Sequence, residues 1–440
     1  MTNMIYTAMP ALPKKHHTNA VVLPSEWNTC PLSSIVEEIS ETVGTRKIET
    51  ISISAGIGFV NQAEKFGREL SGKQYEKYIV LHKGDFSYNK GNSNIYPQGC
   101  IYRLNNRTEA AVPNVFESFR VSVGNPDYYE QLFLSGFLNR QLYSKINRGV
   151  RDNGLLNLKG KDFYSCEVPY PPLAEQERIA EILIQCDRVI EVKEQKLDEL
   201  KQLKKEFLRK MFPAKGCDTP EIRFPGFTGA WEQRKLGEIY GLIGNAFVGT
   251  ATPYYVEQGH FYLESNNVKD GQINHNSEIF INDEFYEKQK DKWLHTGDMV
   301  MVQSGHVGHA AVIPEVLDNT AAHALIMFRN PKEKIEPYFL NFEYQTNKSK
   351  KKIENITTGN TIKHILASDM QEFEVDVPKY EEQKAIAEYF ANLDNLITLH
   401  QRELEETKTY KTAADRDCPG TRITTKTASG VSCRQQDRGK

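Results

Sequence analysis

E-Q-E-R-I-A-E at Glu175–Glu181 returns later in the chain as E-Q-K-A-I-A-E at Glu382–Glu388. The offset is 382 − 175 = 207 residues, nearly half of the 440-residue chain. Both copies follow a Val-Pro pair, and both open a long, highly charged stretch with helical periodicity. A repeat at this distance predicts two similar halves, each made of a globular part followed by a long helix.

Other matches occur in the same order in both halves. Trp27–Ile35 and Trp231–Ile239 share Trp, Leu and Ile in step, and H-K-G-D at His82–Asp85 is matched by H-T-G-D at His295–Asp298. Between these islands the halves differ in sequence. We therefore expect the matched islands to form a shared frame, and the unmatched stretches to carry what distinguishes one half from the other.

Composition narrows the class of protein. A chain of 440 residues with 39% apolar and 26% charged residues is expected to form two or more globular domains. The sequence contains no run of about 18 apolar residues, so no membrane span is expected, and no secretory signal is recognised. Seven cysteines without a C-x-x-C pair indicate reduced thiols in the cytoplasm and no zinc site. The net charge of −3 neither supports nor excludes nucleic-acid binding.

The pattern along the chain predicts a series of segments. They are an irregular N-terminus (1–24), a first globular domain (25–171), a central spacer helix (172–213), a Pro/Gly-rich connector (214–229), a second globular domain (230–378), a distal spacer helix (379–411) and a disordered, atypical tail (412–440). Short β-rich runs are expected in both domains, with one helix in each. The strands are predicted at Ile48–Ile53, Tyr78–Leu81, Phe119–Val123, Phe280–Ile281, Met299–Val302 and Ala324–Phe328, and the helices at Tyr128–Asn147 and Pro337–Lys352.

The two spacer helices carry a heptad seam. From Cys186 to Met211, spacings of four and three residues alternate and select mostly apolar positions. About 38 helical residues would span roughly 57 Å at 1.5 Å per residue. The seam of the second helix weakens toward Thr407. The predicted seam residues are Ile190, Leu197, Leu200, Phe207, Leu393, Ile397 and Leu404.

Two motifs suggest an enzyme but lack the residues that the chemistry needs. Gly67–Lys73 fits G-x-x-x-x-G-K, but Gln74 follows where a phosphate-binding loop needs Ser or Thr for magnesium. Asn125–Tyr128 reads N-P-D-Y and lacks the second proline of the N-P-P-Y loop of adenine methyltransferases. The first is better explained as an ordinary loop, and the second as the N-terminal cap of a helix.

Two further clusters suggest a metal and fail on geometry. Asp187 with Glu191 and Lys193 loosely matches a nuclease set, but these residues lie on the heptad helix and cannot converge on a metal at strand ends. His306 and His309 have no third ligand at metal spacing. No nucleophile, metal or cofactor constellation remains, so a chain with two matched halves is expected to be a recognition component.

Four stretches resemble the specificity subunit of type I restriction-modification systems. They are the helix start P-P-L-A-E-Q-E-R-I-A-E-I-L at Pro171–Leu183, its echo at Tyr380–Phe390, the run F-P-G-F-T-G-A-W-E-Q-R-K-L-G-E at Phe224–Glu238, and K-D-F at Lys161–Phe163. The resemblance covers most of residues 25–408. The tail after Thr409 does not resemble the family, which usually continues its last helix.

The resemblance implies an α+β fold, in which two long antiparallel coiled-coil helices join two mixed α/β target recognition domains with a pseudo-twofold internal repeat. Each domain would read one half of a split double-stranded DNA target, and the helix length would set the gap. A split site needs readers about one turn of DNA apart, roughly 34–36 Å, and a paired-helix spacer can hold them there.

The resemblance also implies that the chain is not itself an enzyme. Adenine methylation and DNA cleavage would belong to methyltransferase subunits, expected in two copies, and to restriction or translocase subunits. Those partners would bring S-adenosylmethionine, ATP and Mg²⁺, so no cofactor or metal is expected in this chain. The expected location is the cytoplasm of a bacterium or archaeon, with no membrane partner.

Side chains that could read DNA gather in polar, Gly-rich loops at matching places in both halves. Base edges are read by Arg, Lys, Asn, Gln, Ser and Thr, and phosphates by Lys and Arg. The candidate DNA contacts are Tyr88, Asn89, Lys90, Asn92 and Ser93 in one loop of the first domain, Arg148, Arg151 and Asn153 in another, Gln303, Ser304 and His306 in a loop of the second domain, and Thr361 and Lys363 in another.

Three other interpretations stay open at this point. A non-catalytic coiled-coil scaffold with two globular ends would have no affinity for DNA. A single-chain restriction or modification enzyme would need the cofactor loop and the N-P-P-Y motif, which the sequence lacks. A truncated or frame-shifted, defective specificity subunit would account for the atypical tail.

Overall fold

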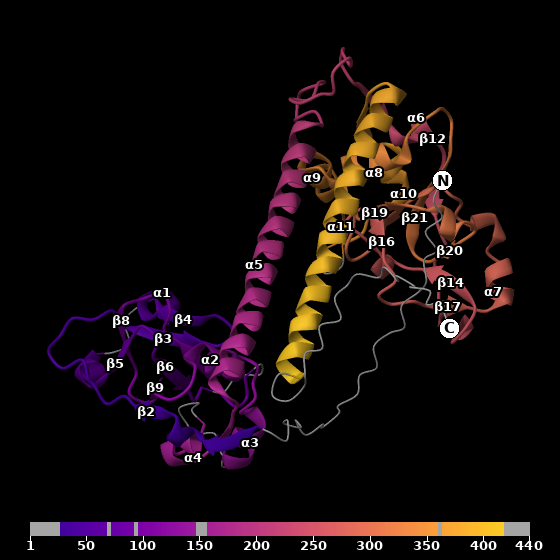
Figure 1. Ribbon diagram of the computed structural model, residues 1–440. Coiled ribbons are helices and arrows are strands. Elements are labelled where there is room, and N and C mark those ends of the chain that lie inside the picture. The colour runs from indigo at the N-terminus through magenta and orange to yellow at the C-terminus, as the bar shows by residue number, and fades with distance from the viewer. Residues whose placement is uncertain (1–26, 68–71, 92–95, 147–155, 360–362, 418–440) are drawn as a thin grey trace, which may run out of the picture. The chain divides into compact units, whose positions relative to one another are not determined.

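The structure is a computed structural model that describes residues 27–67, 72–91, 96–146, 156–359 and 363–417. The chain divides into two compact units, one within residues 1–192 and 404–440 and the other within 193–403. Each unit contains one α/β domain and part of each of two long helices (Figure 1). The predicted irregular N-terminus (1–24) lies outside the described residues.

The first domain is built around a four-stranded antiparallel sheet with the order β2-β9-β6-β7. Phe119 of β9 lies at the centre of its core, with ring centroids 5.5 Å from Phe86 and 5.7 Å from Phe163. The described strands are β1 (Asn28–Pro31), β2 (Val36–Glu38), β3 (Ile51–Ser54), β4 (Gly58–Asn61), β5 (Ile79–His82), β6 (Phe86–Asn89), β7 (Cys100–Arg103), β8 (Glu109–Val112), β9 (Glu117–Val121) and β10 (Glu167–Tyr170). The helices are α1 (Gln62–Phe66), α2 (Pro126–Leu134), α3 (Asn139–Lys145) and α4 (Gly160–Tyr164).

The second domain repeats this sheet. Its order is β12-β21-β18-β19, again antiparallel, and each strand takes the place of its counterpart in the first domain. Its strands are β11 (Glu232–Lys235), β12 (Tyr240–Asn245), β13 (Tyr255–Val256), β14 (His260–Leu263), β15 (Val268–Lys269), β16 (Gln272–Ile273), β17 (Phe280–Ile281), β18 (Met299–Val302), β19 (Ala310–Val312), β20 (Ala321–Ala322), β21 (Leu325–Pro331) and β22 (Glu374–Val377). The helices are α6 (Leu236–Ile239), α7 (Asp283–Glu287), α8 (Pro337–Gln345), α9 (Asn347–Ile356) and α10 (Ala367–Gln371).

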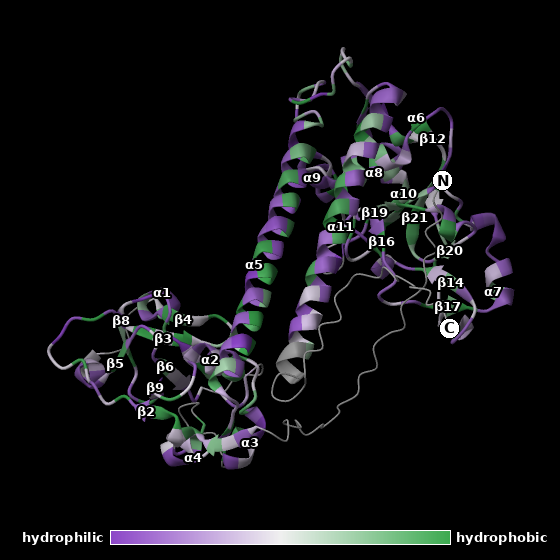
Figure 2. Cartoon of the chain, viewed as in Figure 1, coloured by the Kyte–Doolittle hydropathy of each residue, from purple (hydrophilic) through white to green (hydrophobic). Residues whose placement is uncertain are grey.

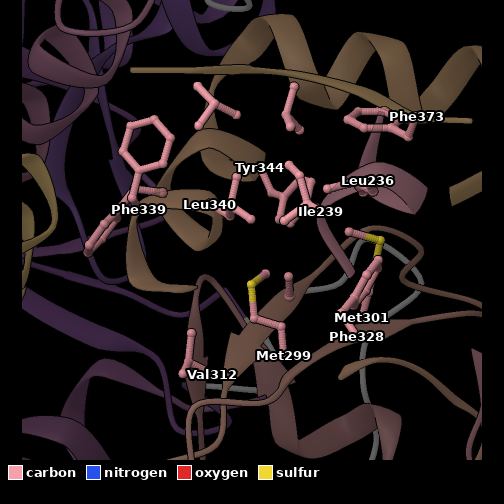
Figure 3. Packing of buried hydrophobic residues seen from close by; sticks show 14 of the residues in the cluster. Leu236, Ile239, Met299, Met301, Val312, Phe328, Phe339, Leu340, Tyr344 and Phe373 are labelled. Atoms are coloured by element: carbon pink, nitrogen blue, oxygen red, sulfur yellow. The ribbon is translucent and has the colours of Figure 1, made fainter. Parts of the chain in front are cut away.

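The core of the second domain lies between this sheet and helix α8. Met299 and Phe328 from the sheet belong to the same buried cluster as Phe339 and Leu340 from the helix, and all four are fully buried (Figure 3). A further sheet, β13-β17-β14-β20, has a separate aromatic core in which Tyr262 is fully buried.

Each domain is closed by pairing its first strand with its last. β1 pairs antiparallel with β10 in the first domain, and β11 pairs antiparallel with β22 in the second. The repeated Trp islands and the repeated Val-Pro islands are therefore neighbours in space, although about 140 residues separate them along the chain. The long helix begins directly after the closing strand, so the domain fixes its starting point.

Gln176 and Gln383, which are equivalent in the repeat, join each long helix to its domain in the same way. Each side-chain amide donates to a carbonyl just before the long helix and accepts from the N-cap residue of the domain helix. The bonds are Gln176 Nε2 to Pro171 O (2.8 Å), Asn125 N to Gln176 Oε1 (2.8 Å), Gln383 Nε2 to Pro378 O (2.8 Å) and Glu336 N to Gln383 Oε1 (3.0 Å). Both glutamines are buried, and their amides supply the donor and the acceptor that these bonds need, which an ionised carboxylate could not do.

The two long helices are α5 (Leu173–Lys210) and α11 (Tyr380–Asp417), and apolar residues recur along both (Figure 2). Residues 412–417 were predicted to be disordered, and this prediction is wrong because they are helical. The hydroxyls of Thr409 and Thr412 each donate to the carbonyl four residues earlier, which accommodates these polar residues in the helix. Residues 418–440 of the predicted tail lie outside the described residues.

Both predicted domain helices are in fact broken in two. Gly136, at φ +77°, follows α2 in the left-handed conformation that ends helices. Thr346, with an extended ψ of 152°, ends α8, and its hydroxyl caps α9 by accepting from Ser349 N at 3.2 Å. Among the strands, Phe280–Ile281 and Met299–Val302 coincide with the prediction, and the others are displaced by one to three residues.

Candidate nucleic-acid interface

A turn that is repeated in both domains lies directly before one central strand of each sheet. In the H-x-G-D islands, Asp85 accepts from His82 N at 2.7 Å and Asp298 accepts from His295 N at 2.8 Å. The same carboxylates pair with an arginine on the neighbouring strand, Arg120 at 2.6 Å in the first domain and Arg329 at 3.3 Å in the second. These turns precede β6 and β18, and the candidate reading loops begin where those strands end.

Tyr88 does not belong to the candidate interface. Its side chain is fully buried in β6, its ring stacks on Phe163 at 4.6 Å, and its hydroxyl donates to Gln98 O at 2.7 Å. Burial raises the pKa of this hydroxyl. The prediction that Tyr88 contacts DNA is wrong, because a side chain in the core cannot reach a base edge.

Asn89 and Lys90 hold the first reading loop in place. The Asn89 side chain accepts from Gly91 N at 2.8 Å and thus shapes the turn. Lys90 is only 16% exposed, forms an ion pair with Glu117, and donates to Leu158 O at 3.4 Å. These contacts fit a supporting role better than the predicted direct contact with DNA. The other candidates of this domain, Asn92, Ser93, Arg148, Arg151 and Asn153, lie outside the described residues.

In the second domain, the structure brings the two predicted loops together. Ser304 forms a β-bridge with His364, Gly305 N donates to Lys363 O at 3.1 Å, and Ile365 N donates to Gln303 O at 3.0 Å. The Gln303 side-chain oxygen is buried and has no hydrogen-bond partner among the described residues. His306 and Lys363 are exposed, whereas Thr361 lies outside the described residues.

These loops border a pocket of about 280 Å³, which we call the loop pocket. His306, His309, Lys350 and Lys363 are among the residues that line it. Lys350 lies on α9 and was not among the predicted contacts. The signal for it was present as the run K-S-K-K-K at 348–352, within a segment that was assigned only to a helix.

His309 supplies a neutral ring to the loop pocket. Burial lowers the pKa of His309, and its Nδ1 accepts from Asp270 N at 3.2 Å. That bond leaves the proton on Nε2, which is then a donor. Lys350, Lys363 and this ring give the loop pocket the donors that phosphate oxygens or base edges require.

Nothing in the described part of the chain is arranged for metal chemistry. No group of three or more His, Cys, Asp or Glu side chains among those residues could hold a metal ion. The rings of His306 and His309 are 6.4 Å apart. None of the described helices is long and apolar enough to cross a membrane.

The predicted seam residues lie on the less exposed side of both long helices. Leu197, Leu200, Leu393 and Leu404 are buried, while Ile190, Phe207 and Ile397 are half-buried. Within the second unit the helices are antiparallel, because Lys193 pairs with Glu403 at 3.1 Å and Lys204 pairs with Asp394 at 2.7 Å.

The repeat extends to an ion pair in each unit. In the first unit, Lys411 pairs with Asp187. Lys411 lies 207 residues after Lys204, and Asp394 lies 207 residues after Asp187, so the two pairs are reciprocal under the repeat. The second helix therefore retains its frame contact beyond Thr407, where the apolar seam weakens.

Comparison with known proteins gives a family. The type I restriction modification DNA specificity domain matches this chain twice, over residues 24–202 and 229–409. The chain therefore belongs to the type I restriction-modification specificity family, as its sequence resemblance predicted. Both matches combine one domain with most of the long helix that follows it.

Individual relatives agree with this family. The chain is 25% identical over 277 residues to the type I restriction enzyme MjaVIII specificity subunit of Methanocaldococcus jannaschii, and the match covers 61% of this chain and 64% of that protein. The chain thus spans slightly less than two thirds of that relative's length.

Two solved structures share the fold. One is the S subunit of a type I restriction-modification system from M. genitalium, with a TM-score of 0.56, 12% identity, and coverage of 94% of this chain and 99% of that chain. The other comes from work on complex assembly and conformational transition of the type I R-M system, with a TM-score of 0.53, 16% identity, and coverage of 91% and 99%. The predicted α+β class with an internal repeat is confirmed.

Proposed function

We propose that this chain is the sequence-reading, non-catalytic subunit of a type I restriction-modification complex. Each α/β domain reads one half of a split target in double-stranded DNA, and the two long helices form the spacer between the half-sites. In the second domain, the loop pocket with His306, Lys350 and Lys363 is the reading surface that the described residues support best.

The observation that carries this proposal is the double match of a DNA specificity domain onto two halves with one frame and different loops. Three features are repeated in detail: the pairing of the first and last strands, the hydrogen bonds of Gln176 and Gln383, and the turns at Asp85 and Asp298. The loops that follow β6 and β18 differ in sequence. Two domains with the same scaffold and different loops suit a protein that reads two different half-sites.

The long helices also offer a surface for partner subunits. Val189, Val192 and Leu203 of α5 are 45%, 63% and 44% exposed. The positions 207 residues later on α11 are again exposed and apolar, namely Leu396 (40%), Leu399 (52%) and Tyr410 (60%). A repeated apolar surface supports the docking of two copies of one partner, for which we propose methyltransferase subunits.

Catalysis belongs to the partners in this proposal. Methyltransferase subunits bring S-adenosylmethionine, and restriction or translocase subunits bring ATP and Mg²⁺. The complex acts on cellular DNA, which places the chain in the cytoplasm of a bacterium or archaeon.

Methylation mapping tests the proposal. The full chain is produced with its cognate methyltransferase subunit in cells that lack other adenine methylation, and the modified adenines in genomic DNA are located. The expected result is two short motifs at one constant gap. Methylation at a single uninterrupted motif, or none with an active methyltransferase, would contradict a split-site reader.

Lys363→Ala examines the loop pocket in the same system. Loss of a cationic contact should weaken binding to the mapped duplex by roughly 5- to 150-fold, the range of about 1–3 kcal/mol for a specific contact. Lys288→Ala is the matched control, because Lys288 is exposed in the same domain and does not line the loop pocket. Equal binding by both variants would remove Lys363 from the reading surface.

A further inference from the structure

A second pocket in the second unit is larger and more basic than the loop pocket. It has a volume of about 450 Å³, and we call it the helix groove. Its lining comes from α5, the α8–α9 junction, the β15–β16 hairpin and α11. Five basic and two acidic side chains line it: Lys201, Lys204, Lys205, Arg209 and Lys350, with Asp270 and Asp394.

The half-buried charges of the helix groove, Lys204 and Asp394, neutralise each other. Lys204 is 14% exposed and holds Asp394 at 2.7 Å, and it also donates to Gln345 Oε1 at 2.9 Å. Burial raises the pKa of Asp394, while the neighbouring Lys204 opposes that shift. This pair belongs to the frame of the helices, so it is not available to a ligand.

The rim carries the uncompensated charge. Lys201, Lys205 and Lys350 are exposed, and none of them lies within 4.0 Å of a described carboxylate. Arg209 forms ion pairs with both Glu206, at 3.1 Å, and Glu221, at 3.4 Å. The rim also holds Asp270, which is 72% exposed and 3.8 Å from the His309 ring. In a chain with a net charge of −3, three lysines around one groove that form no ion pair with a described carboxylate are a local positive site.

The position of Lys350 connects this groove to the candidate reading surface. Lys350 lines both the loop pocket and the helix groove, so the two adjoin along α9, the helix groove at its N-terminal part and the loop pocket at its C-terminal part. A duplex read at His306 and Lys363 would therefore extend toward Lys350 and the α5 lysines. Lys201 and Lys205 are one helical turn apart, roughly 6 Å along the axis, and can meet neighbouring phosphates.

We propose that the helix groove binds the phosphodiester backbone of the duplex beside the half-site read by the second domain. This inference rests on the proposed function and adds a contact outside the reading loops. Lysines that meet phosphates carry no sequence information, so the helix groove contributes affinity and register to the complex without choosing bases. The spacer helix would then take part in DNA binding as well as setting the gap.

A salt titration of Lys201→Ala/Lys205→Ala in the full chain, assembled with its methyltransferase, tests this. Binding to a fluorescent duplex with the mapped target is measured at several salt concentrations. Each phosphate contact contributes about 0.9 to the slope of log K against log salt, so two lost contacts should reduce it by roughly 1.8. The ratio of affinities for the mapped duplex and a duplex with a scrambled second half-site should stay unchanged.

Lys196→Ala is the matched control. It makes the same charge change on the same helix, is 53% exposed, pairs only loosely with Glu199 at 3.6 Å, and does not line the helix groove. Its slope should equal that of the wild type. Thermal melting of all variants checks the fold, and substitution of these exposed lysines should leave the melting curve unchanged.

Three outcomes overturn the inference. One is an unchanged salt slope in the double variant. Another is weakened assembly with the methyltransferase at an unchanged slope, which would assign the helix groove to an acidic protein segment. The third is calorimetric binding of inorganic phosphate that the double variant loses without any change of slope, which would indicate a small-anion site. A wild type that fails to prefer the mapped duplex contradicts the proposed function instead, and the slope can still be measured on any duplex.

Discussion

At the scale of single residues, the repeated glutamines explain why the E-Q island is present in both halves. Gln383 donates to Pro378 O and accepts from Glu336 N while almost fully buried. Glutamate cannot replace it, because a carboxylate would place an oxygen against the carbonyl of Pro378. The neighbouring glutamates have different partners in the two halves: Glu175 accepts from Trp27 Nε1, whereas Glu382 is buried and pairs with Arg223 of the connector.

Gln383→Glu should therefore destabilise the second domain. A buried carbonyl loses its donor, which costs about 1–3 kcal/mol of unfolding free energy. Thermal or urea unfolding measures the loss, with Gln195→Glu on the exposed side of α5 as control. Equal midpoints for the two variants would show that the bridge adds no stability.

Glu343 gives the second domain a dependence on pH. Burial raises the pKa of its carboxyl to about 8, while the N–H of Asp376, at 3.0 Å, and the nearby Lys352 and Lys348 oppose the shift. Between the unfolded value of about 4.3 and this pKa, the folded chain holds a proton that the unfolded chain lacks. The contribution to stability is therefore full below about pH 4.3 and is lost as the pH rises toward 8, at about 1.4 kcal/mol per pH unit.

Glu343→Gln should remove this slope, because the amide remains neutral and keeps the acceptor for Asp376 N. Unfolding free energies at pH 5, 6, 7 and 8 check the expectation. Exposed Glu354→Gln is the control and should retain the wild-type profile. A Glu343→Gln profile as steep as that of the wild type would mean that other groups cause the pH dependence.

At the scale of elements, the long helices are held by reciprocal ion pairs of unequal burial. Asp394 is 15% exposed and faces Lys204, whereas Asp187 is 42% exposed, faces Lys411 and also accepts from Gln131 Nε2 at 3.2 Å. Removing the lysine leaves a buried charge in one case and a largely solvated charge in the other.

Lys204→Ala should consequently cost about 3–5 kcal/mol, and Lys411→Ala should cost at most about 1 kcal/mol. Melting of the full chain measures both, and Lys204→Met, which restores apolar packing, helps to separate lost volume from the stranded charge. Equal losses at the two sites would mean that burial does not govern these pairs.

At the scale of the whole molecule, the sequence predicted what depends on repetition and periodicity. The two halves follow from the E-Q, Gly-Asp and Val-Pro matches that recur in order, and the heptad seam follows from the alternating spacings of four and three residues. The features that the sequence did not predict depend on the conformation and contacts of single residues. Gly136 and Thr346 break the two domain helices through their backbone conformation, and α11 continues to Asp417 although the polar composition of its end favoured disorder.

The candidate site was harder to predict, because residue type alone does not report burial. Tyr88 has a side chain suited to nucleic acid, yet it fills the core beside Phe163. Lys350 was overlooked because its lysine run reads as a generic helical surface, and only the tertiary structure places it beside the Gln303–His306 loop. Pairing of that loop with Lys363 spans about 60 residues of chain and required the fold.

The shared position of Lys350 bears on how such a protein can acquire new targets. The loop pocket and the helix groove meet at this one side chain on a capped helix packed against the domain core. In the proposed binding mode, substitutions in the reading loops alter the preferred bases while the contact between Lys350 and the DNA backbone persists, so a variant in transition between two specificities keeps its general affinity for the duplex. Substitutions in the loops would be tolerated, whereas substitutions that rotate α9 would be selected against.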